Sequence, residues 1–316
     1  MKILFLGAGG VGGYFGGRLI EAGADVTFQV RPARAEQLSR NGLVVKSPLG
    51  DARLPVKTIV AADGAPDFNL IVLTCKAYDL EAAMEAIRTH VARGAIVLPL
   101  LNGIRHIDDL RATFGADRII GGMCQIEATL SSDGSVEHKN QFARLVFGLL
   151  ADPSPGTAAD PAAAGLAAAC AKANFTWKRI DPVDQSLWDK WVMIGTLGGI
   201  TALMRGAVGD VMAAKEGREI IEELLQEAIA VASESGYAPS PEYLSSIRKL
   251  LTAPGSTFMA SMLRDIEKGG RTEAEHIIGD MYRRAHEMGH DATVLRLVYC
   301  HLQAYEARRV RQGLSG

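Results

Sequence analysis

The sequence predicts an α/β fold in which a doubly wound parallel sheet is followed by a second, all-helical domain. Two observations support this prediction. After Asp181-Pro182 the pattern is helical almost to the end of the chain, so we divide it into an α/β domain at 1–181 and a helical domain at 182–316. Before that point, short apolar runs alternate with helical patterns, which is typical of a buried parallel sheet. These runs lie at residues 1–6, 24–30, 70–74 and 95–100.

A glycine-rich turn connects the first predicted strand to the first predicted helix. Gly7 permits a tight turn, Gly9 lets the backbone approach a pyrophosphate, and Gly12 lets the helix pack close to the strand. The N-terminus of the helix offers backbone N–H groups to the phosphates. A GxGxxG motif alone is weak, but between a strand and a helix it predicts a Rossmann-type dinucleotide site. We assign the site to Gly7, Ala8, Gly9, Gly10, Val11 and Gly12.

The end of the second predicted strand indicates which dinucleotide binds. An NAD site usually has an acidic residue there, which holds the ribose 2′-hydroxyl. Here the strand is followed by Arg31, with Arg34 three residues later. A guanidinium suits a 2′-phosphate, so NADP(H) is favoured over NAD(H). The alternative is that both arginines belong to a solvated first helical turn.

The remaining segments of the α/β domain have weaker patterns. A helix is expected at 32–41 and short strands at 43–46 and 54–56. The segments 119–130, 135–138 and 143–149 are expected to form antiparallel strands. The rest is predicted as a loop at 151–157, an alanine-rich helix at 161–173 and a strand at 175–178.

Composition excludes several classes of function. The 316 residues suffice for about two domains. A net charge of −2 gives no electrostatic footprint for nucleic acid or an anionic membrane. The longest apolar run, Trp191 to Met204, contains glycines and is too short to span a bilayer. The first strand begins at once, so we expect no signal peptide and a soluble, cytoplasmic protein. Alanine and glycine in the helical domain are compatible with a homodimer.

The cysteines do not indicate a metal site. Cys75, Cys124, Cys170 and Cys300 are far apart and form neither a CxxC motif nor a cluster with histidine. We interpret them as buried thiols in a reducing compartment and expect no metal.

Two polar residues follow strands at the edge where ligands of a parallel sheet gather. Lys76 follows the strand at 70–74, and its ammonium could meet a phosphate or carboxylate. The alternative is an exposed loop lysine. Asn102 follows the strand at 95–100 and could hold a nicotinamide or a substrate through its amide. The pattern by itself favours the alternative, a turn residue before Gly103.

Two charged residues of the helical domain could carry chemistry in a cleft between the domains. Lys190 lies between Trp188 and Trp191, and desolvation there would lower its pKa and make it a better proton donor near neutral pH. The alternative is a lysine that extends to solvent at a helix end. Glu273 lies in a segment that opens a helix, with Thr272 as a predicted N-cap and Glu275 at the capping-box position. The favoured alternative is that these acids only stabilise the helix N-terminus.

In this order, these elements resemble the ketopantoate reductase (2-dehydropantoate 2-reductase) family over essentially the whole chain. The order and spacing of seven elements are far more specific than any one of them. The elements are Gly7–Gly12, Arg31, Thr74-Cys75-Lys76, Leu101-Asn102-Gly103, Trp188-x-Lys190, Ser261 through Asp265 and Arg271-Thr272-Glu273.

The resemblance implies an NADPH-dependent reduction of a branched 2-keto acid, ketopantoate, in pantothenate synthesis. It implies that Lys190 is the general acid that protonates the carbonyl oxygen and that Glu273 orients the site and the lysine. It also implies that Ser261 binds the substrate carboxylate and that Asn102 bridges nicotinamide and substrate. The cofactor would contact the glycine motif, Arg31, Lys76, Asn102 and Glu273.

The chain departs from the family at two substrate-binding positions. The family usually has asparagines one and two helical turns after the lysine, where this chain has Ile194 and Gly198. Loss of an amide partner can redirect specificity. One alternative is therefore a reductase of a different, more apolar 2-keto acid. A weaker alternative is a non-catalytic NADP(H)-sensing protein, against which the retention of Lys190, Ser261 and Glu273 argues.

Overall fold

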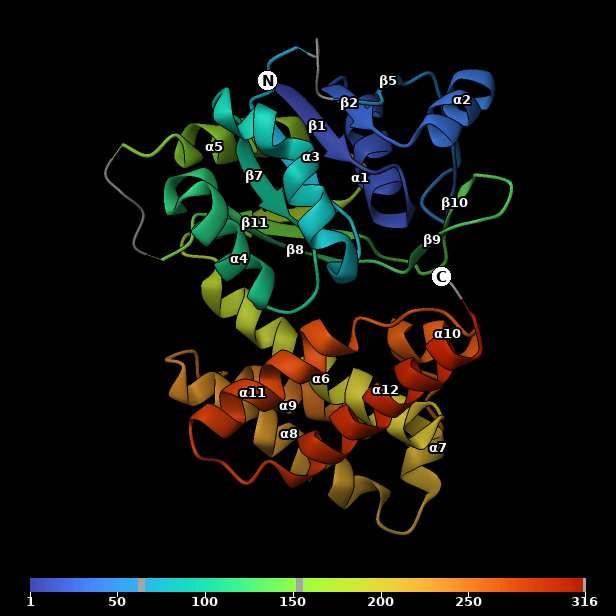
Figure 1. The fold of residues 1–316 in the computed structure, drawn as a ribbon, viewed down its shortest axis with the longest axis vertical. Coiled ribbons are helices and arrows are strands. Elements are labelled where there is room, and N and C mark those ends of the chain that lie inside the picture. The colour runs from blue at the N-terminus through green and yellow to red at the C-terminus, as the bar shows by residue number, and fades with distance from the viewer. Residues whose placement is uncertain (62–65, 152–155, 315–316) are drawn as a thin grey trace. The chain divides into compact units, whose positions relative to one another are not determined.

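The computed structural model describes residues 1–61, 66–151 and 156–314, and the chain folds into two compact units (Figure 1). The first unit consists of Met1–Leu101 and His106–Asp184, and the second of Asn102–Arg105 and Gln185–Gly316. The short segment Asn102–Arg105 thus packs with the helical unit, although the sequence places it within 1–181.

The first unit is built on a five-stranded parallel sheet, as predicted. Its strand order is β5-β2-β1-β6-β7, and every neighbouring pair is parallel. Chain order reverses between β1 and β6, so the carboxyl ends of these two strands lie side by side, with Leu6 paired to Leu73. Ligands of doubly wound sheets bind at such a switch point. The strands are β1 (Lys2–Leu6), β2 (Asp25–Gln29), β5 (Lys57–Ile59), β6 (Leu70–Leu73) and β7 (Ile96–Pro99).

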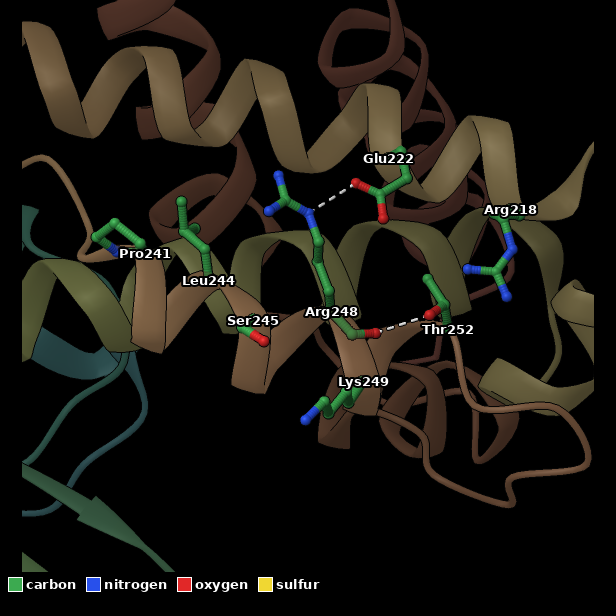
Figure 2. Close-up of a pocket in the computed structure, with 8 residues that line it drawn as sticks. All are labelled: Arg218, Glu222, Pro241, Leu244, Ser245, Arg248, Lys249 and Thr252. Carbon is green, nitrogen blue, oxygen red and sulfur yellow. Dashed lines mark hydrogen bonds and ion pairs between the residues drawn. The ribbon is translucent and has the colours of Figure 1, made fainter.

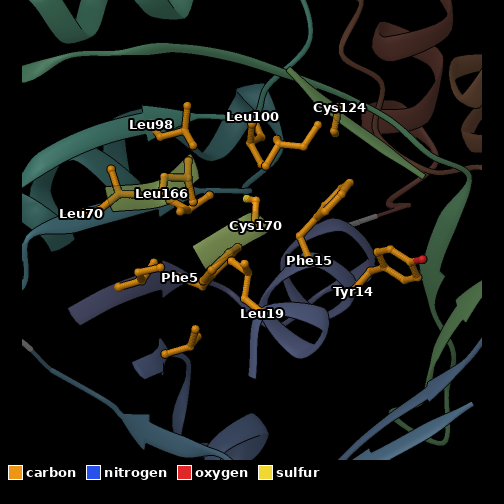
Figure 3. Packing of buried hydrophobic residues seen from close by; sticks show 14 of the residues in the cluster. Phe5, Tyr14, Phe15, Leu19, Leu70, Leu98, Leu100, Cys124, Leu166 and Cys170 are labelled. Atoms are coloured by element: carbon orange, nitrogen blue, oxygen red, sulfur yellow. The ribbon is translucent and has the colours of Figure 1, made fainter. Parts of the chain in front are cut away.

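Aromatic side chains from β1 and the first helix form the centre of the core (Figure 3). The ring of Phe15 meets that of Phe175 edge-on, with 5.0 Å between centroids. Phe5 and Phe15 are both at most 1% exposed, and full burial of such a side chain stabilises the fold by roughly 1.5–3 kcal/mol. The helices of this unit are α1 (Gly10–Glu21), α2 (Pro32–Asn41), α3 (Leu80–Ala92), α4 (Arg105–Phe114, whose first residue belongs to the other unit) and α5 (Ala159–Cys170).

Two smaller sheets correct the prediction for the rest of this unit. The run 119–130, predicted as one strand, forms two strands that belong to different sheets. The predicted antiparallel pairing is right for β8 with β11 and for β9 with β10, but β10 also pairs in parallel with β3, and β11 with β12. The sheets consist of β4 (Ala52–Leu54), β3 (Leu43–Lys46), β10 (Val136–His138) and β9 (Ala128–Leu130), and of β12 (Thr176–Arg179), β11 (Arg144–Gly148) and β8 (Gly121–Gln125).

The strand predicted at 54–56 is wrong for a local reason. Pro55 has no backbone N–H and cannot donate to a ladder, so pairing stops there. Ala52–Leu54 pairs with β3, whereas Lys57–Ile59 joins the central sheet. In the predicted loop at 151–157, residues 152–155 lie outside the described part of the chain.

The described residues of the second unit form helices joined by loops and no strands. Glycines of the long helix α6 permit close packing: a Cβ at Gly195 would lie 2.8 Å from Met281 Cε, and one at Gly199 would lie 3.0 Å from Leu224 Cδ2. The helices are α6 (Asp184–Met204), α7 (Val208–Ala213), α8 (Gly217–Glu234), α9 (Pro241–Leu251), α10 (Ser261–Glu267), a π-helical turn η3 (Glu275–Gly279), α11 (Asp280–Glu287) and α12 (Thr293–Arg311). Among the described residues, none of the helices combines the length and the apolar character that spanning a membrane requires.

The prediction of buried thiols is right for two cysteines and wrong for one. Cys124 and Cys170 are buried, and burial raises the pKa of the Cys170 thiol to about 12. Cys75 is only half-buried, and Cys300, on α12, is exposed. Within the described ranges, no three histidine, cysteine, aspartate or glutamate side chains gather in a way that could hold a metal ion.

Candidate active site

The glycine motif has the backbone geometry of a dinucleotide-binding turn. Gly7 has φ of +97°, a left-handed conformation that side chains rarely adopt. A Cβ at Gly12 would lie 2.4 Å from the Gly7 carbonyl oxygen and 2.4 Å from Thr74 Oγ1, so α1 approaches the strand ends closely only because residue 12 is glycine. A Cβ at Gly9 would meet no atom within 4 Å, so this position faces open space. The turn therefore has room where a pyrophosphate would lie.

The start of α1 is suited to an anion. No side chain caps the helix at Gly9, and its first turn contains no acidic residue. The positive end of the helix dipole therefore is not neutralised by the helix's own first turn. On another side of the motif, strand β9 passes so close that a Cβ at Gly10 would lie 2.5 Å from the Ala128 carbonyl oxygen. Gly10 is therefore required by packing.

The two arginines after β2 have different environments. Arg31 is exposed and immediately precedes α2. Arg34 is half-buried: its Nη2 donates to the Ala8 carbonyl at 2.9 Å, and its Nη1 donates to the Gly134 carbonyl at 2.9 Å and to Gln37 Oε1 at 2.5 Å. The alternative of a solvated helical turn is therefore wrong for Arg34, which ties the glycine motif to the turn between β9 and β10. Arg31, at the start of the helix, is the arginine whose side chain is exposed.

Lys76 lies close to the switch point of the sheet. It follows β6 by three residues, is half-buried, and precedes a short 3₁₀ helix, Ala77–Asp79. The hydroxyl of Thr74 in the same segment donates to the Leu6 carbonyl at 3.1 Å, which ties the end of β6 to the end of β1. The alternative of a fully exposed loop lysine does not hold.

In the second unit, the predicted lysine and asparagine meet. Lys190 Nζ donates to Asn102 Oδ1 at 2.9 Å, and the lysine is only 9% exposed. The alternative of a lysine extended into solvent is therefore wrong. For Asn102 the turn interpretation is right, because Gly103 has φ of +85°, and the asparagine side chain also binds the lysine. A buried ammonium held by a neutral amide is a group that can donate a proton.

Two tryptophans lie next to Lys190 on α6. Trp191 is 1% exposed, and its Nε1 donates to the Ile277 carbonyl at 3.0 Å. Trp188 stacks on Tyr237, with 5.2 Å between ring centroids and 12° between planes. The Arg284 guanidinium lies 5.8 Å and 5.7 Å from the ring centroids of Trp188 and Trp191. The two tryptophans that flank Lys190 in the sequence are thus held in place by their own contacts.

Glu273 is buried beside the π-helical turn, but the capping predicted around it is wrong. Glu273 is 7% exposed, and its carbonyl accepts from the N–H groups of residues 276 and 277. The backbone N–H and hydroxyl of Thr272 donate to Glu306 Oε1 at 2.8 Å and 2.7 Å, so Thr272 does not cap the helix. The carboxylate of Glu275 accepts from Tyr299 Oη at 2.5 Å and from Arg283. Burial works against ionisation of Glu275, but these two donors leave its pKa lowered.

The remaining predicted substrate residues lie on α6 and α10. Ile194 and Gly198 follow Lys190 at intervals of four residues, so the three lie on one face of α6. Ser261 is exposed at the start of α10. A Cβ at Gly198 would make ordinary contact with Met262 Cε at 3.4 Å, which places the start of α10 against this part of α6.

A separate pocket contains none of the predicted site residues. It occupies about 470 Å³ between α8 and α9 (Figure 2). Its Arg248 donates to Glu222 at 3.1 Å, and Thr252 Oγ1 donates to the Arg248 carbonyl at 2.8 Å. The first bond ties α8 to α9, and the second joins the end of α9 to the residue that follows it, so we assign the pocket no role in the reaction. Its lining consists of Arg218, Glu222, Pro241, Leu244, Ser245, Arg248, Lys249 and Thr252.

The sequence interpretation missed His276 and the π-helical turn that contains it. His276 is 8% exposed, and a Cβ at Gly103 would lie 3.0 Å from its Cδ2 and 3.0 Å from its carbonyl oxygen. Thus His276 packs against the residue that follows Asn102. A π-helical turn has no distinctive residue pattern, so only the histidine itself could have drawn attention to this position.

Comparison with known proteins matches both halves of the chain. The family model of ketopantoate reductase PanE/ApbA matches residues 3–152, and that of its C-terminal part matches residues 183–306. The uncharacterised oxidoreductase YkpB of Bacillus subtilis is 34% identical over 98% of this chain and 100% of its own length.

Solved structures have the same fold. The 2-dehydropantoate 2-reductase of Geobacter metallireducens has a TM-score of 0.85 and 27% identity, over 96% of this chain and 99% of that one. D-mandelate dehydrogenase, solved with NADH and anilino(oxo)acetate, has a TM-score of 0.85 and 22% identity, over 98% of this chain and 99% of that one.

Proposed function

Because the chain belongs to the ketopantoate reductase PanE/ApbA family, and is therefore an oxidoreductase that acts on CH–OH groups, we propose that it reduces 2-dehydropantoate to pantoate with NADPH. The observation that carries this proposal is the buried Lys190–Asn102 pair, in which an ammonium is held by a neutral amide. Reduction of a ketone needs a hydride and a proton, and Lys190 is a suitable source of the proton. The reaction belongs to pantothenate synthesis.

The residues at the edge of the first unit fit a dinucleotide. Gly7 makes the turn, Gly9 leaves open space for the pyrophosphate, and the uncapped start of α1 attracts its charge. Arg31 would bind the 2′-phosphate and Lys76 would lie near the cofactor and the substrate. When bound, NADPH supplies the hydride.

The residues of the second unit carry the proton chemistry. Lys190 donates a proton to the carbonyl oxygen as the hydride reaches the carbonyl carbon, so the ketone becomes an alcohol. Asn102 holds the lysine and bridges nicotinamide and substrate. Glu273, which is buried in the same unit, orients the site, and Ser261 binds the substrate carboxylate.

The function is tested by steady-state oxidation of NADPH with 2-dehydropantoate and with a panel of other 2-keto acids, for wild type and Ile194→Asn. We expect 2-dehydropantoate to give the highest kcat/KM in wild type. If wild type uses another 2-keto acid better by tenfold or more, and Ile194→Asn restores the preference for 2-dehydropantoate, the substrate is the other, more apolar acid. If no acid is reduced, the proposed function is wrong.

The proposed cofactor preference predicts different effects for two arginine variants. Arg31→Ala should raise the Kd of NADPH by about 10- to 150-fold and leave that of NADH unchanged. The reason is that charge-assisted hydrogen bonds, each worth roughly 1.5–3 kcal/mol, form only with the 2′-phosphate. Fluorescence titration of the purified protein with each nucleotide measures both values.

Arg34→Ala is the matched control, because Arg34 supports the glycine motif through the Ala8 carbonyl instead of being exposed. It should weaken NADPH and NADH binding by similar factors and lower the midpoint of thermal unfolding. Equal losses for both nucleotides in Arg31→Ala would contradict the assignment of the 2′-phosphate to Arg31.

A further inference from the structure

We infer that the π-helical turn Glu275–Gly279 positions the Lys190–Asn102 pair for proton transfer. The positioning residues are His276, which belongs to the turn, and Trp191 of α6, which is hydrogen-bonded to it. The turn contacts the chain beside each partner of the pair, through different atoms. The inference rests on the proposed function, because it assigns the pair a proton-donating role.

On the asparagine side, the contact is made by His276. Gly103 follows Asn102 with φ of +85°, and its Cα approaches the His276 ring and carbonyl so closely that a Cβ would lie 3.0 Å from both. His276 is 8% exposed, so its ring is fixed by the surrounding atoms. The backbone beside Asn102 therefore rests on this ring, which limits where the amide oxygen can lie.

On the lysine side, the contact is a hydrogen bond. The indole N–H of Trp191, the residue after Lys190, donates to the Ile277 carbonyl at 3.0 Å. Trp191 is 1% exposed and also lies under the Arg284 guanidinium, whose Nε donates to Asp280 Oδ2 at 3.1 Å. The turn of α6 that carries Lys190 is thus attached to the π-helical turn next to His276.

Adjacent residues of a single turn therefore hold both partners of the pair. π-Helical turns are rare, and those inside helices are frequent at functional sites. A close approach at its last residue accompanies this turn, because a Cβ at Gly279 would lie 2.8 Å from Tyr299 Cε2. A displacement of about 1 Å in a catalytic group can cost roughly 100-fold in rate, so an element that fixes both groups has a direct effect on kcat.

The test uses Trp191→Phe, which removes only the indole N–H and part of the ring, together with His276→Ala and His276→Phe. We expect Trp191→Phe and His276→Ala to lower kcat by about 10- to 100-fold, with the KM of the keto acid and the Kd of NADPH within about twofold of wild type. The solvent deuterium isotope effect on kcat should rise, because proton transfer becomes slower. His276→Phe keeps a ring against Gly103 and should recover most of kcat.

Trp177→Phe is the control for loss of an indole, because Trp177 stacks on Phe147 in the first unit, with 6.2 Å between centroids. It should leave kcat and the isotope effect unchanged. A merely structural role would lower the unfolding midpoint of Trp191→Phe and His276→Ala without changing the isotope effect, and that result would overturn the inference. Unchanged kcat in both variants would also overturn it.

A crystal structure of Trp191→Phe separates this inference from the proposed function. We expect the separation of Lys190 Nζ and Asn102 Oδ1 to increase from 2.9 Å to beyond hydrogen-bonding distance. If the bond persists unchanged, the π-helical turn does not position the pair. If the bond is lost but wild type reduces no keto acid, the positioning is right and the proposed reaction is wrong.

Discussion

Replacement of Lys190 by alanine is expected to lower kcat for keto acid reduction by about 10²- to 10⁴-fold, the usual contribution of a positioned general acid. The Kd of NADPH should remain within about twofold of wild type, because the residues assigned to the pyrophosphate and the 2′-phosphate lie in the other compact unit. Stopped-flow oxidation of NADPH under single-turnover conditions measures the chemical step directly.

Lys190→Arg tests whether charge alone suffices. It keeps a cation that can donate a hydrogen bond, but a guanidinium does not give up its proton in proteins, so kcat should stay close to that of Lys190→Ala. Asn102→Ala, which removes the partner 2.9 Å away, should lower kcat less than loss of the lysine itself. If Lys190→Ala keeps wild-type activity, the proton comes from another group. If wild type and Lys190→Ala both bind NADP(H) but neither reduces any keto acid, a sensing role would be favoured.

Two alanine variants of the glycine motif should both weaken NADPH binding, but only one of them should destabilise the fold. Gly12→Ala places a Cβ 2.4 Å from a backbone carbonyl oxygen and from Thr74 Oγ1, so the strand and α1 must separate. Overpacking of this kind typically costs about 1–3 kcal/mol of unfolding free energy. Urea denaturation should show this loss, and NADPH binding should fall with it because the turn is distorted.

Gly9→Ala is the matched variant, since a Cβ there meets no atom within 4 Å and Gly9 has an ordinary φ of −85°. Its unfolding free energy should remain within about 0.5 kcal/mol of wild type, as for changes that disturb no packing. Its Kd for NADPH should nevertheless rise by more than tenfold, because the methyl group stands where the pyrophosphate must approach the backbone. Unchanged affinity in Gly9→Ala would contradict the predicted position of the cofactor.

Local patterns were sufficient to predict the parallel sheet. The buried strands β1, β6 and β7 are short runs of apolar residues, which are typical of a parallel sheet covered on both faces. Gly7 stands where the turn after β1 requires a positive φ, which glycine adopts without strain. Apart from the strand predicted at 54–56, which Pro55 interrupts, two further predictions failed because the partner of the segment is remote in sequence. The run 119–130 had to be divided between two sheets, and the hydroxyl of Thr272 bonded Glu306 of α12 instead of the backbone beside it.

The candidate site was predictable in its residue types but not in its arrangement. Lys190 and Asn102 were each selected for their own surroundings, and their 2.9 Å hydrogen bond spans 88 positions of sequence. Arg31 and Arg34 were indistinguishable by pattern, and only the contact of Arg34 with the Ala8 carbonyl separates a structural arginine from an exposed one.

The sequence by itself therefore determined the alternation of strands and helices and the turn that opens α1, because each depends on residues within one or two turns or strands. It also singled out Lys190, whose burial only the structure decided. Tertiary structure decided that Asn102–Arg105 packs with the helical unit, that Asn102 meets Lys190, and that a π-helical turn carries His276 to Gly103. These contacts depend on how helices far apart in the sequence pack, and packing is set by the shapes of all their side chains together.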